Sequence, residues 1–280
     1  MTTREFWRSI EAIHDVVYFA PEAIERYEQL GLRGFWMGYC ASRGGALGAV
    51  GPEVATALFH GFAPGRVGRA LPDAWDRTTP DAVLTARLDG AREALERGFV
   101  DLPADVDVAR TADALHQLAG MLDLAGRPLA AAHRSVPAPT DPLGKLWHAA
   151  TVLREYRGDS HVAVLTAAGL GGAESNALAA AVGLVTHDQY RSRGWTEEQW
   201  AAAFDRLQQF GWVDGTEATE TGRAARERLE DATDRSCGAG LDQEGTARAY
   251  ALVPALVPMA RSIESTGVIF YPNPTGVPQP

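Results

Sequence analysis

The chain has 280 residues, of which 46% are hydrophobic and 22% are charged, and its formal net charge is −10. This length allows two modest domains or one large one, and the composition excludes a disordered chain and a fibrous repeat. The negative charge repels nucleic-acid backbones and anionic lipid surfaces unless a local basic patch overrides it.

Helical spacing of apolar residues dominates residues 1–135, which we predict to form an N-terminal helical domain. Apolar residues recur at helical intervals before Pro21. Prolines and a threonine mark the starts of several helices. No convincing alternating strand pattern occurs in this half. The helices that we expect here cover residues 6–17, 21–31, 52–59, 80–98 and 106–124.

The segment 136–142 contains three prolines in seven residues and cannot continue a helix, so we place a domain boundary there. We expect residues 143–236 to form a winged-helix-like domain. Residues 237–280 are expected to form a closing helix and an extended proline-rich tail, which either covers a cleft or a neighbouring subunit or is disordered from Gly276. The helices that we expect after the boundary cover residues 143–156, 160–168, 173–182, 197–210, 221–235 and 244–265.

A β-hairpin is predicted directly after the helix at 197–210. Thr196 and Gln199 have the spacing of a capping box at the start of that helix, and Gly211 is placed to end it. The residues that follow, 212–216, have the pattern of a strand that enters an Asp-Gly turn. The fold class expected for the whole chain is therefore mainly α with one short β-hairpin.

This order of elements resembles the winged-helix domains of MarR-type regulators over most of residues 143–236. Leu207, Phe210, Gly211 and Thr221-Gly222 match the positions that hold the hairpin, or wing, against the helices in that family. The resemblance implies a fold in which the helix before the hairpin would lie in the major groove of DNA. It does not by itself imply a function.

A second resemblance extends over most of the chain. It is carried by the strings Ala-Ser-Arg at 41–43, Leu-Trp-His-Ala-Ala-Thr at 146–151, Arg-Gly-Asp-Ser-His at 157–161 and Arg-Gly-Trp at 193–195. Together they resemble a family of actinobacterial winged-helix-like proteins of largely unknown function. This resemblance implies no particular activity.

The charges of the winged-helix-like segment argue against DNA binding. Residues 143–235 carry ten basic and fourteen acidic side chains. The helix at 196–210 has three acidic residues and a single arginine, and residues 211–222 contain no basic residue. A protein that reads duplex DNA normally places lysine or arginine on these elements, so we expect DNA binding to be absent.

No known catalytic motif is present, and three groups of residues remain as candidates for a site. The first group is Trp36, Tyr39 and Arg43, in a segment too apolar to be solvated. Arg43 requires an anionic partner, which is either an internal carboxylate or a bound carboxylate or enolate, with Tyr39 as the donor or acid. The second candidate is His60, which is either a core or capping residue or a ligand-binding residue.

The third group contains His148, Arg154, Arg157, Asp159 and His161. We predict that the helix from 143 ends at Arg157-Gly158 and that Asp159 caps the next helix. His161 would then lie in a first helical turn, where the helix dipole keeps its imidazole neutral and suited to act as a general base. The alternative is that these residues form a structural corner only, with His148 packed against the N-terminal domain.

Trp195 is the last candidate, as either a core anchor or a wall of a ligand pocket. The two cysteines, Cys40 and Cys237, and the histidines have no metal-ligand spacing, so we expect no metal and no other cofactor. No run of 18 uncharged apolar residues occurs, and the start of the chain is too charged for a signal peptide. We therefore expect a cytoplasmic protein that does not contact membranes.

The function that we predict is the binding of a small molecule in a pocket between the two domains. Cofactor-free acid–base catalysis by His161 and Tyr39 is the enzymatic extension of this prediction. The main alternative is a ligand-responsive transcription regulator, and a third is a structural protein that binds a partner. A homodimer is left open.

Overall fold

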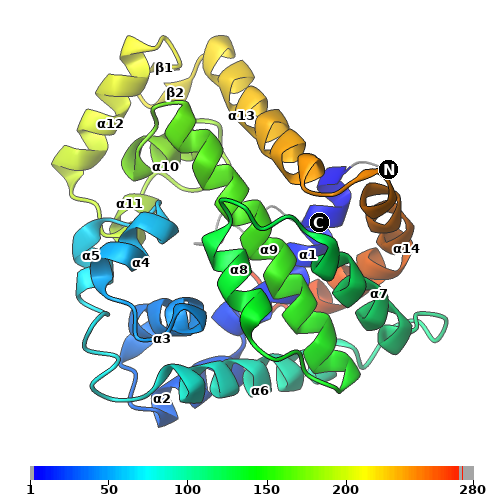
Figure 1. Cartoon of the computed structure of the whole chain (residues 1–280). Helices are drawn as coiled ribbons and strands as arrows, with labels where there is room; N and C mark the ends of the chain where they lie inside the picture. Colours follow the sequence, from blue (N-terminus) through cyan, green and yellow to red (C-terminus); the bar gives the residue numbers. More distant parts are fainter. Residues whose placement is uncertain (1–2, 271–272, 274–280) are drawn as a thin grey trace.

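The computed structural model describes residues 3–270 and 273, and in these residues the protein is mainly α-helical with one short β-hairpin (Figure 1). The elements that precede the long central helix are α1 (Thr3–Phe19), α2 (Pro21–Gln29), α3 (Gly34–Gly44), the 3-10 turn η1 (Gly45–Leu47), α4 (Pro52–Phe59), α5 (Pro64–Gly68), α6 (Pro80–Gly98), α7 (Val108–Met121) and α8 (Pro128–Ser135). The central helix and its successors are α9 (Pro142–Ala167), α10 (Gly172–Ala181), α11 (Gln189–Arg193), α12 (Glu197–Gln209), β1 (Val213–Asp214), β2 (Glu217–Ala218), α13 (Glu220–Ala239) and α14 (Gln243–Ser265).

Most helices begin at the capping signals in the sequence. Proline occupies the first turn of α2, α4, α6 and α9, where its missing N–H has no intrahelical partner to lose. The Thr79 hydroxyl accepts a hydrogen bond from the third residue of α6. At α12 the predicted capping box is confirmed, because Thr196 Oγ1 accepts from the Gln199 amide and Gln199 Oε1 accepts from the Thr196 amide, at 3.2 and 3.0 Å.

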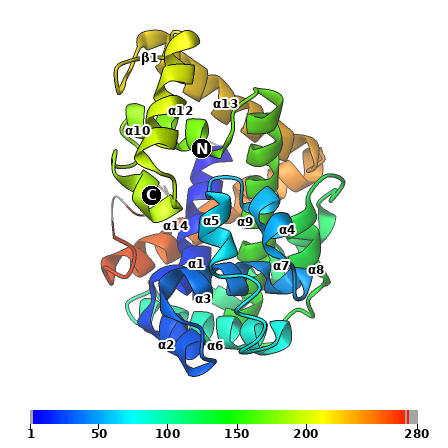
Figure 2. The same ribbon diagram turned by 90° about the vertical axis from the view of Figure 1, so that its left-hand side faces the viewer.

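The buried apolar side chains form two separate clusters. The larger cluster is built from α1 to α8, the first half of α9 and the closing helix α14, and α1 packs directly against α14. The smaller cluster is built from the end of α9, α10, α12, β1 and α13. Figures 1 and 2 show α9 extending from the first group of helices to the second, and α13 returning from the hairpin toward α14.

The helix α9 therefore belongs to both clusters. Leu153 in its first half lies in the larger cluster, and Leu165 near its end lies in the smaller one. Residues 146–156, which we assigned to the winged-helix-like domain, thus pack with the N-terminal helices. The division of the chain at 136–142 stays a prediction, because clusters of buried side chains do not by themselves define domains.

The predicted break at Arg157-Gly158 is wrong, because α9 continues through it to Ala167 as a single helix. A glycine inside a helix costs only about 1 kcal/mol relative to alanine, and packing on both sides of Gly158 overrides this preference. Tyr156 and Ser160 are fully buried, and the Asp159 carboxylate accepts a hydrogen bond from the Ala130 amide of α8 at 3.0 Å. Asp159 therefore ties α9 to the first turn of α8 and does not cap a helix that begins at residue 160.

Four helices lie outside the ranges that we expected from the sequence, namely α3, α5, α8 and α11. Two of them contain only five residues, and α8 is a short alanine-rich helix that begins at Pro128. The helix α7 is shorter than predicted at both ends, because Asp107 caps it and Leu122 is already extended. The closing helix α14 covers the expected residues, although Pro254 and Pro258 lie inside it.

The hairpin after α12 is confirmed. β1 pairs antiparallel with β2, with Val213 opposite Ala218 and Asp214 opposite Glu217. Gly211 and Gly215 both have positive φ, at the end of α12 and in the turn of the hairpin.

The expected path of the proline-rich tail over a cleft or a neighbouring subunit lies almost entirely outside the described residues. In the part of the chain that the structure describes, no helix combines the length and hydrophobicity that a membrane span requires.

Candidate functional site

A cleft of about 590 Å³ lies between the two hydrophobic clusters, and α1, α3, α9, α10 and α13 supply most of its walls. Part of the wall is apolar. The apolar side chains of the wall come from both clusters and from the elements that join them: Trp7, Leu58, Phe59, Val162, Leu165, Leu178, Ala179, Val182, Leu184, Val185 and Leu229. A cleft of this size and composition is typical of a small-molecule site.

The charged part of the wall is dominated by arginine. Eight arginines and three glutamates line the cleft, although the chain as a whole has a net charge of −10. Five of these arginines form ion pairs with carboxylates in or behind the wall, namely Arg4, Arg43, Arg154, Arg157 and Arg226. Arg8 and Arg223 are exposed and form no ion pair with any described residue. The cleft therefore offers two guanidinium groups that no carboxylate in the described part of the chain pairs with.

Arg43 and Tyr39 lie at the buried end of the cleft, where α3 meets α9. The Arg43 guanidinium donates from Nε and Nη2 to both carboxylate oxygens of Glu155, at 2.9 and 2.8 Å, and from Nη1 to the Tyr39 hydroxyl at 3.2 Å. Burial alone would raise the pKa of Glu155, but Arg43 and Arg154 overcome this effect and hold it well below its usual range.

If Arg43 were a ligand clamp, that is, a residue that binds the carboxylate or enolate of a ligand, no protein carboxylate should accept hydrogen bonds from two of its nitrogens. Glu155 contradicts this requirement, and the alternative of an internal salt bridge describes what the structure contains. Tyr39 shares the cleft with Arg43, as their four-residue spacing predicted.

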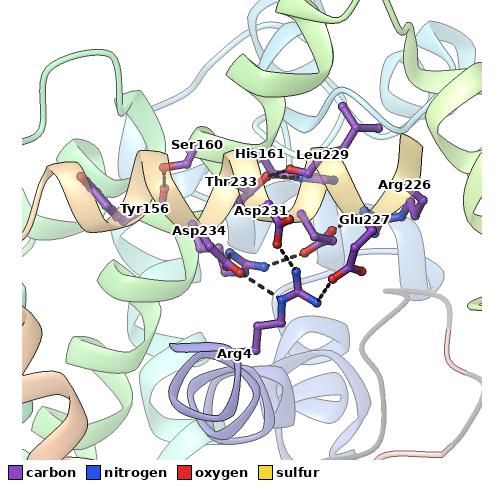
Figure 3. A network of polar contacts seen from close by, with 12 residues as sticks. Arg4, Tyr156, Ser160, His161, Arg226, Glu227, Leu229, Asp231, Thr233 and Asp234 are labelled. Atoms are coloured by element: carbon purple, nitrogen blue, oxygen red, sulfur yellow. Dashed lines mark hydrogen bonds and ion pairs between the residues drawn. The ribbon is translucent and has the colours of Figure 1, made fainter. Parts of the chain in front are cut away.

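Arg157 lines the cleft and joins α9 to α13. Its guanidinium donates to Asp234 at 2.8 Å and to Glu230 at 2.7 Å, while Arg4 of α1 donates to Asp234, Asp231 and Glu227 of the same helix (Figure 3). Burial would raise the pKa of Glu230, but the nearby arginines, Arg226 foremost, lower it to about 2. These ion pairs fix the position of α13 against α1 and α9.

His161 lies one turn beyond Arg157 on α9 and lines the cleft. The prediction that it occupies a first helical turn is wrong, because it lies deep within the continuous α9. Its pKa is lowered to about 4, chiefly by burial. The imidazole is therefore neutral at neutral pH, as expected for a base, but burial is the cause.

His60 lines the cleft at the end of α4 and has a positive φ of 47°, which is rare for a residue other than glycine. Its conformation is held by close packing, because the backbone carbonyl of His60 lies against Gly172 at the start of α10. Burial lowers the pKa of His60. Asn176, which sequence reasoning missed, donates to the adjacent Gly61 carbonyl at 2.7 Å and so helps to join α10 to this wall.

Three of the predicted ligand-binding residues do not line the cleft. Trp36 packs against the rings of Tyr39 and Phe62 and under the Arg66 guanidinium. Trp195 donates from its indole to the Gly61 carbonyl at 3.2 Å. His148 is buried beneath α8, where its Nε2 lies 3.0 Å from the His133 carbonyl oxygen.

Sequence reasoning placed Arg154 in the third group of candidates but missed the cleft residues of α13. Once α9 is continuous, Arg154, Arg157, His161 and Leu165 follow one another at intervals of three or four residues, so they share one helical face. Arg223, Arg226 and Glu230 follow the same rule on α13. The predicted break at Gly158 concealed the first of these faces.

The described residues contain no group of three or more histidine, cysteine, aspartate or glutamate side chains that could hold a metal ion. The cleft residues offer arginine guanidinium groups, apolar surface and hydrogen-bonding groups to a ligand.

The helices α10 to α13 and the hairpin between α12 and α13 define a protein of the helix-turn-helix class. A family model described as a helix-turn-helix family matches residues 3–270, which include every residue of the cleft. The chain belongs to this helix-turn-helix family. No curated protein and no solved structure matches the chain.

Proposed function

We propose that the protein binds an anionic, largely apolar small molecule in the cleft between its two hydrophobic clusters. The observation that carries this proposal is the combination of an apolar wall with two arginines, Arg8 and Arg223, that form no ion pair with a described carboxylate. The apolar wall gains free energy by covering the body of the ligand, and the two guanidinium groups attract its anion. The helix-turn-helix scaffold would then carry a ligand site that is separate from the surface that this fold would present to DNA.

The expected result is that the protein binds 2-naphthalenesulfonate more tightly than the neutral 2-naphthalenesulfonamide, which has the same rings without the negative charge. Replacing both Arg8 and Arg223 by glutamine should weaken sulfonate binding about tenfold, because two charge-assisted contacts at an exposed site contribute roughly 1.4 kcal/mol together. Isothermal titration calorimetry measures both affinities.

Arg228→Gln is the matched control for these substitutions, because Arg228 is an exposed residue of α13 that does not line the cleft. Its affinity for the sulfonate should equal that of the unmodified protein. Equal affinities for the sulfonate and the sulfonamide would contradict the proposal, as would an equal loss in the Arg228 variant.

The enzymatic extension of this proposal is acid–base catalysis without a cofactor. It is supported by the presence of His161 and Tyr39 in the same cleft, one as a neutral imidazole and the other as a hydroxyl beside a guanidinium.

A second candidate function is that of a ligand-responsive regulator, which the helix-turn-helix family and the MarR-like order of elements favour. Its difficulty is electrostatic. Arg206, the one basic residue of α12, is paired with Glu174 of α10 at 2.8 Å, so it is not a free cation for phosphate. The hairpin contributes Asp214 and Glu217. DNA phosphates would therefore meet mainly negative charge on both elements.

We expect no sub-micromolar complex with duplex DNA at physiological ionic strength, as measured by fluorescence anisotropy with a pool of random duplexes. The control is a variant in which Glu198, Asp205 and Glu217 are replaced by lysine. It should gain salt-sensitive DNA binding, because the change adds six units of positive charge to the surface that the fold would present to the groove. A salt-sensitive sub-micromolar complex of the unmodified protein would favour the regulator instead.

A further inference from the structure

One hydrogen-bonded chain fixes where the proton of His161 lies. Thr233 Oγ1 is 2.8 Å from the Leu229 carbonyl oxygen, one turn earlier in α13, and 2.9 Å from His161 Nδ1 (Figure 3). Two oxygen atoms at 2.8 Å require a hydrogen between them, and a carbonyl oxygen has none to give. The single hydroxyl proton of Thr233 is therefore used on Leu229.

The contact between Thr233 and His161 must then be supplied by the imidazole. Because the threonine oxygen has no second proton, His161 Nδ1 carries a hydrogen and donates it to Thr233. A neutral imidazole carries only one N–H hydrogen, and burial keeps this ring neutral at neutral pH. The other nitrogen, Nε2, is consequently an unprotonated hydrogen-bond acceptor.

The hydrogen bond of the His161 ring to α13 uses Nδ1, which leaves Nε2 as the nitrogen available to the cleft. The charged and titratable groups around the ring are Glu230, Arg226, Arg157 and His60. Both arginines already donate to Glu230, and Arg157 also donates to Asp234. Since His161 lines the cleft, Nε2 can accept a hydrogen bond from water or from a ligand there.

We propose that the ligand carries an O–H or N–H donor in addition to its anionic group, so that the cleft selects hydroxylated, largely apolar acids such as phenolic ones. This inference rests on the proposed function, which supplies the anion and the apolar body. His161 Nε2 adds the third element of recognition. Thr233 is a positioning residue, because it acts only by fixing the tautomer of His161.

The test compares 6-hydroxy-2-naphthalenesulfonate with 2-naphthalenesulfonate, which differ by one hydroxyl group, by calorimetry at neutral pH. The unmodified protein should bind the hydroxylated probe about three to tenfold more tightly, as expected for one net hydrogen bond. His161→Phe should abolish this preference, so that the variant binds the two probes with equal affinity. Equal binding of the two probes by the unmodified protein would overturn the inference and leave the proposed function intact.

Thr233 provides a second variant with a readout that is independent of the ligand. Nitrogen-15 NMR of the imidazole should show the Nδ1–H tautomer in the unmodified protein and in Thr233→Ser, which keeps the hydroxyl. Thr233→Val should populate the Nε2–H tautomer and reduce the preference for the hydroxylated probe. An Nε2–H tautomer in the unmodified protein would overturn the inference. Failure of both probes to bind would overturn the proposed function together with it.

Discussion

Replacing Arg43 by methionine is expected to lower the free energy of unfolding by about 3 kcal/mol, because it leaves the buried Glu155 carboxylate without its bidentate partner. Glu155 is completely buried, and Arg43 is the only side chain that donates to both of its oxygens among the described residues. Arg154 still donates to one oxygen at 3.0 Å, which places the loss near the lower end of the range for a broken buried pair. Urea denaturation followed by circular dichroism measures it.

Two controls separate this effect from a loss of ligand binding. The double variant Arg43→Met, Glu155→Met removes the stranded charge and should recover much of the stability, whereas Arg8→Met changes an exposed residue and should alter stability by less than about 0.5 kcal/mol. The affinity of folded Arg43→Met for 2-naphthalenesulfonate should stay near that of the unmodified protein. A stable Arg43→Met variant with lost sulfonate affinity would return Arg43 to the role of a ligand clamp.

The local signals in the sequence located most of the helices and the hairpin. Proline, threonine and glycine act within one turn of a helix end, so the start of α6 at Pro80 and the end of α12 before Gly211 follow from neighbouring residues alone. Gly158 shows the limit of this reasoning. Its preference to break a helix is weak, and burial of Tyr156 and Ser160 against distant segments decides the outcome.

The candidate site was less predictable, because its walls come from segments far apart in the chain. Arg4 pairs with Glu227 across 223 positions, and Arg43 pairs with Glu155 across 112. A sequence shows that a buried arginine requires an anion but does not show whether the protein or a ligand supplies it. His161 could be selected from the sequence because a neutral imidazole can act as a general base. Thr233, which fixes the position of the His161 proton, could not, because no sequence pattern distinguishes this threonine from the others.

Replacing Gly222 by alanine is expected to destabilise the winged-helix-like part by about 2–3 kcal/mol. A Cβ atom at this position would lie 1.9 Å from the Trp212 carbonyl oxygen, which is backbone and cannot rotate away. The same carbonyl accepts a hydrogen bond from the Thr219 amide at 3.0 Å, and Thr219 caps α13 through the Gly222 amide. The substitution therefore forces apart the hairpin and the first turn of α13, and hydrogen exchange of the Thr219 amide should accelerate.

Gly238→Ala is the matched control, because Gly238 lies in the same helix and a Cβ atom there would meet nothing within 4 Å. Alanine in a helix interior is favoured over glycine, so this variant should be as stable as the unmodified protein or more stable by up to about 1 kcal/mol. Since Arg223 follows Gly222 directly and lines the cleft, Gly222→Ala should also weaken binding of 2-naphthalenesulfonate, whereas Gly238→Ala should not. Equal stability of the two variants would show that the hairpin does not depend on its close contact with α13.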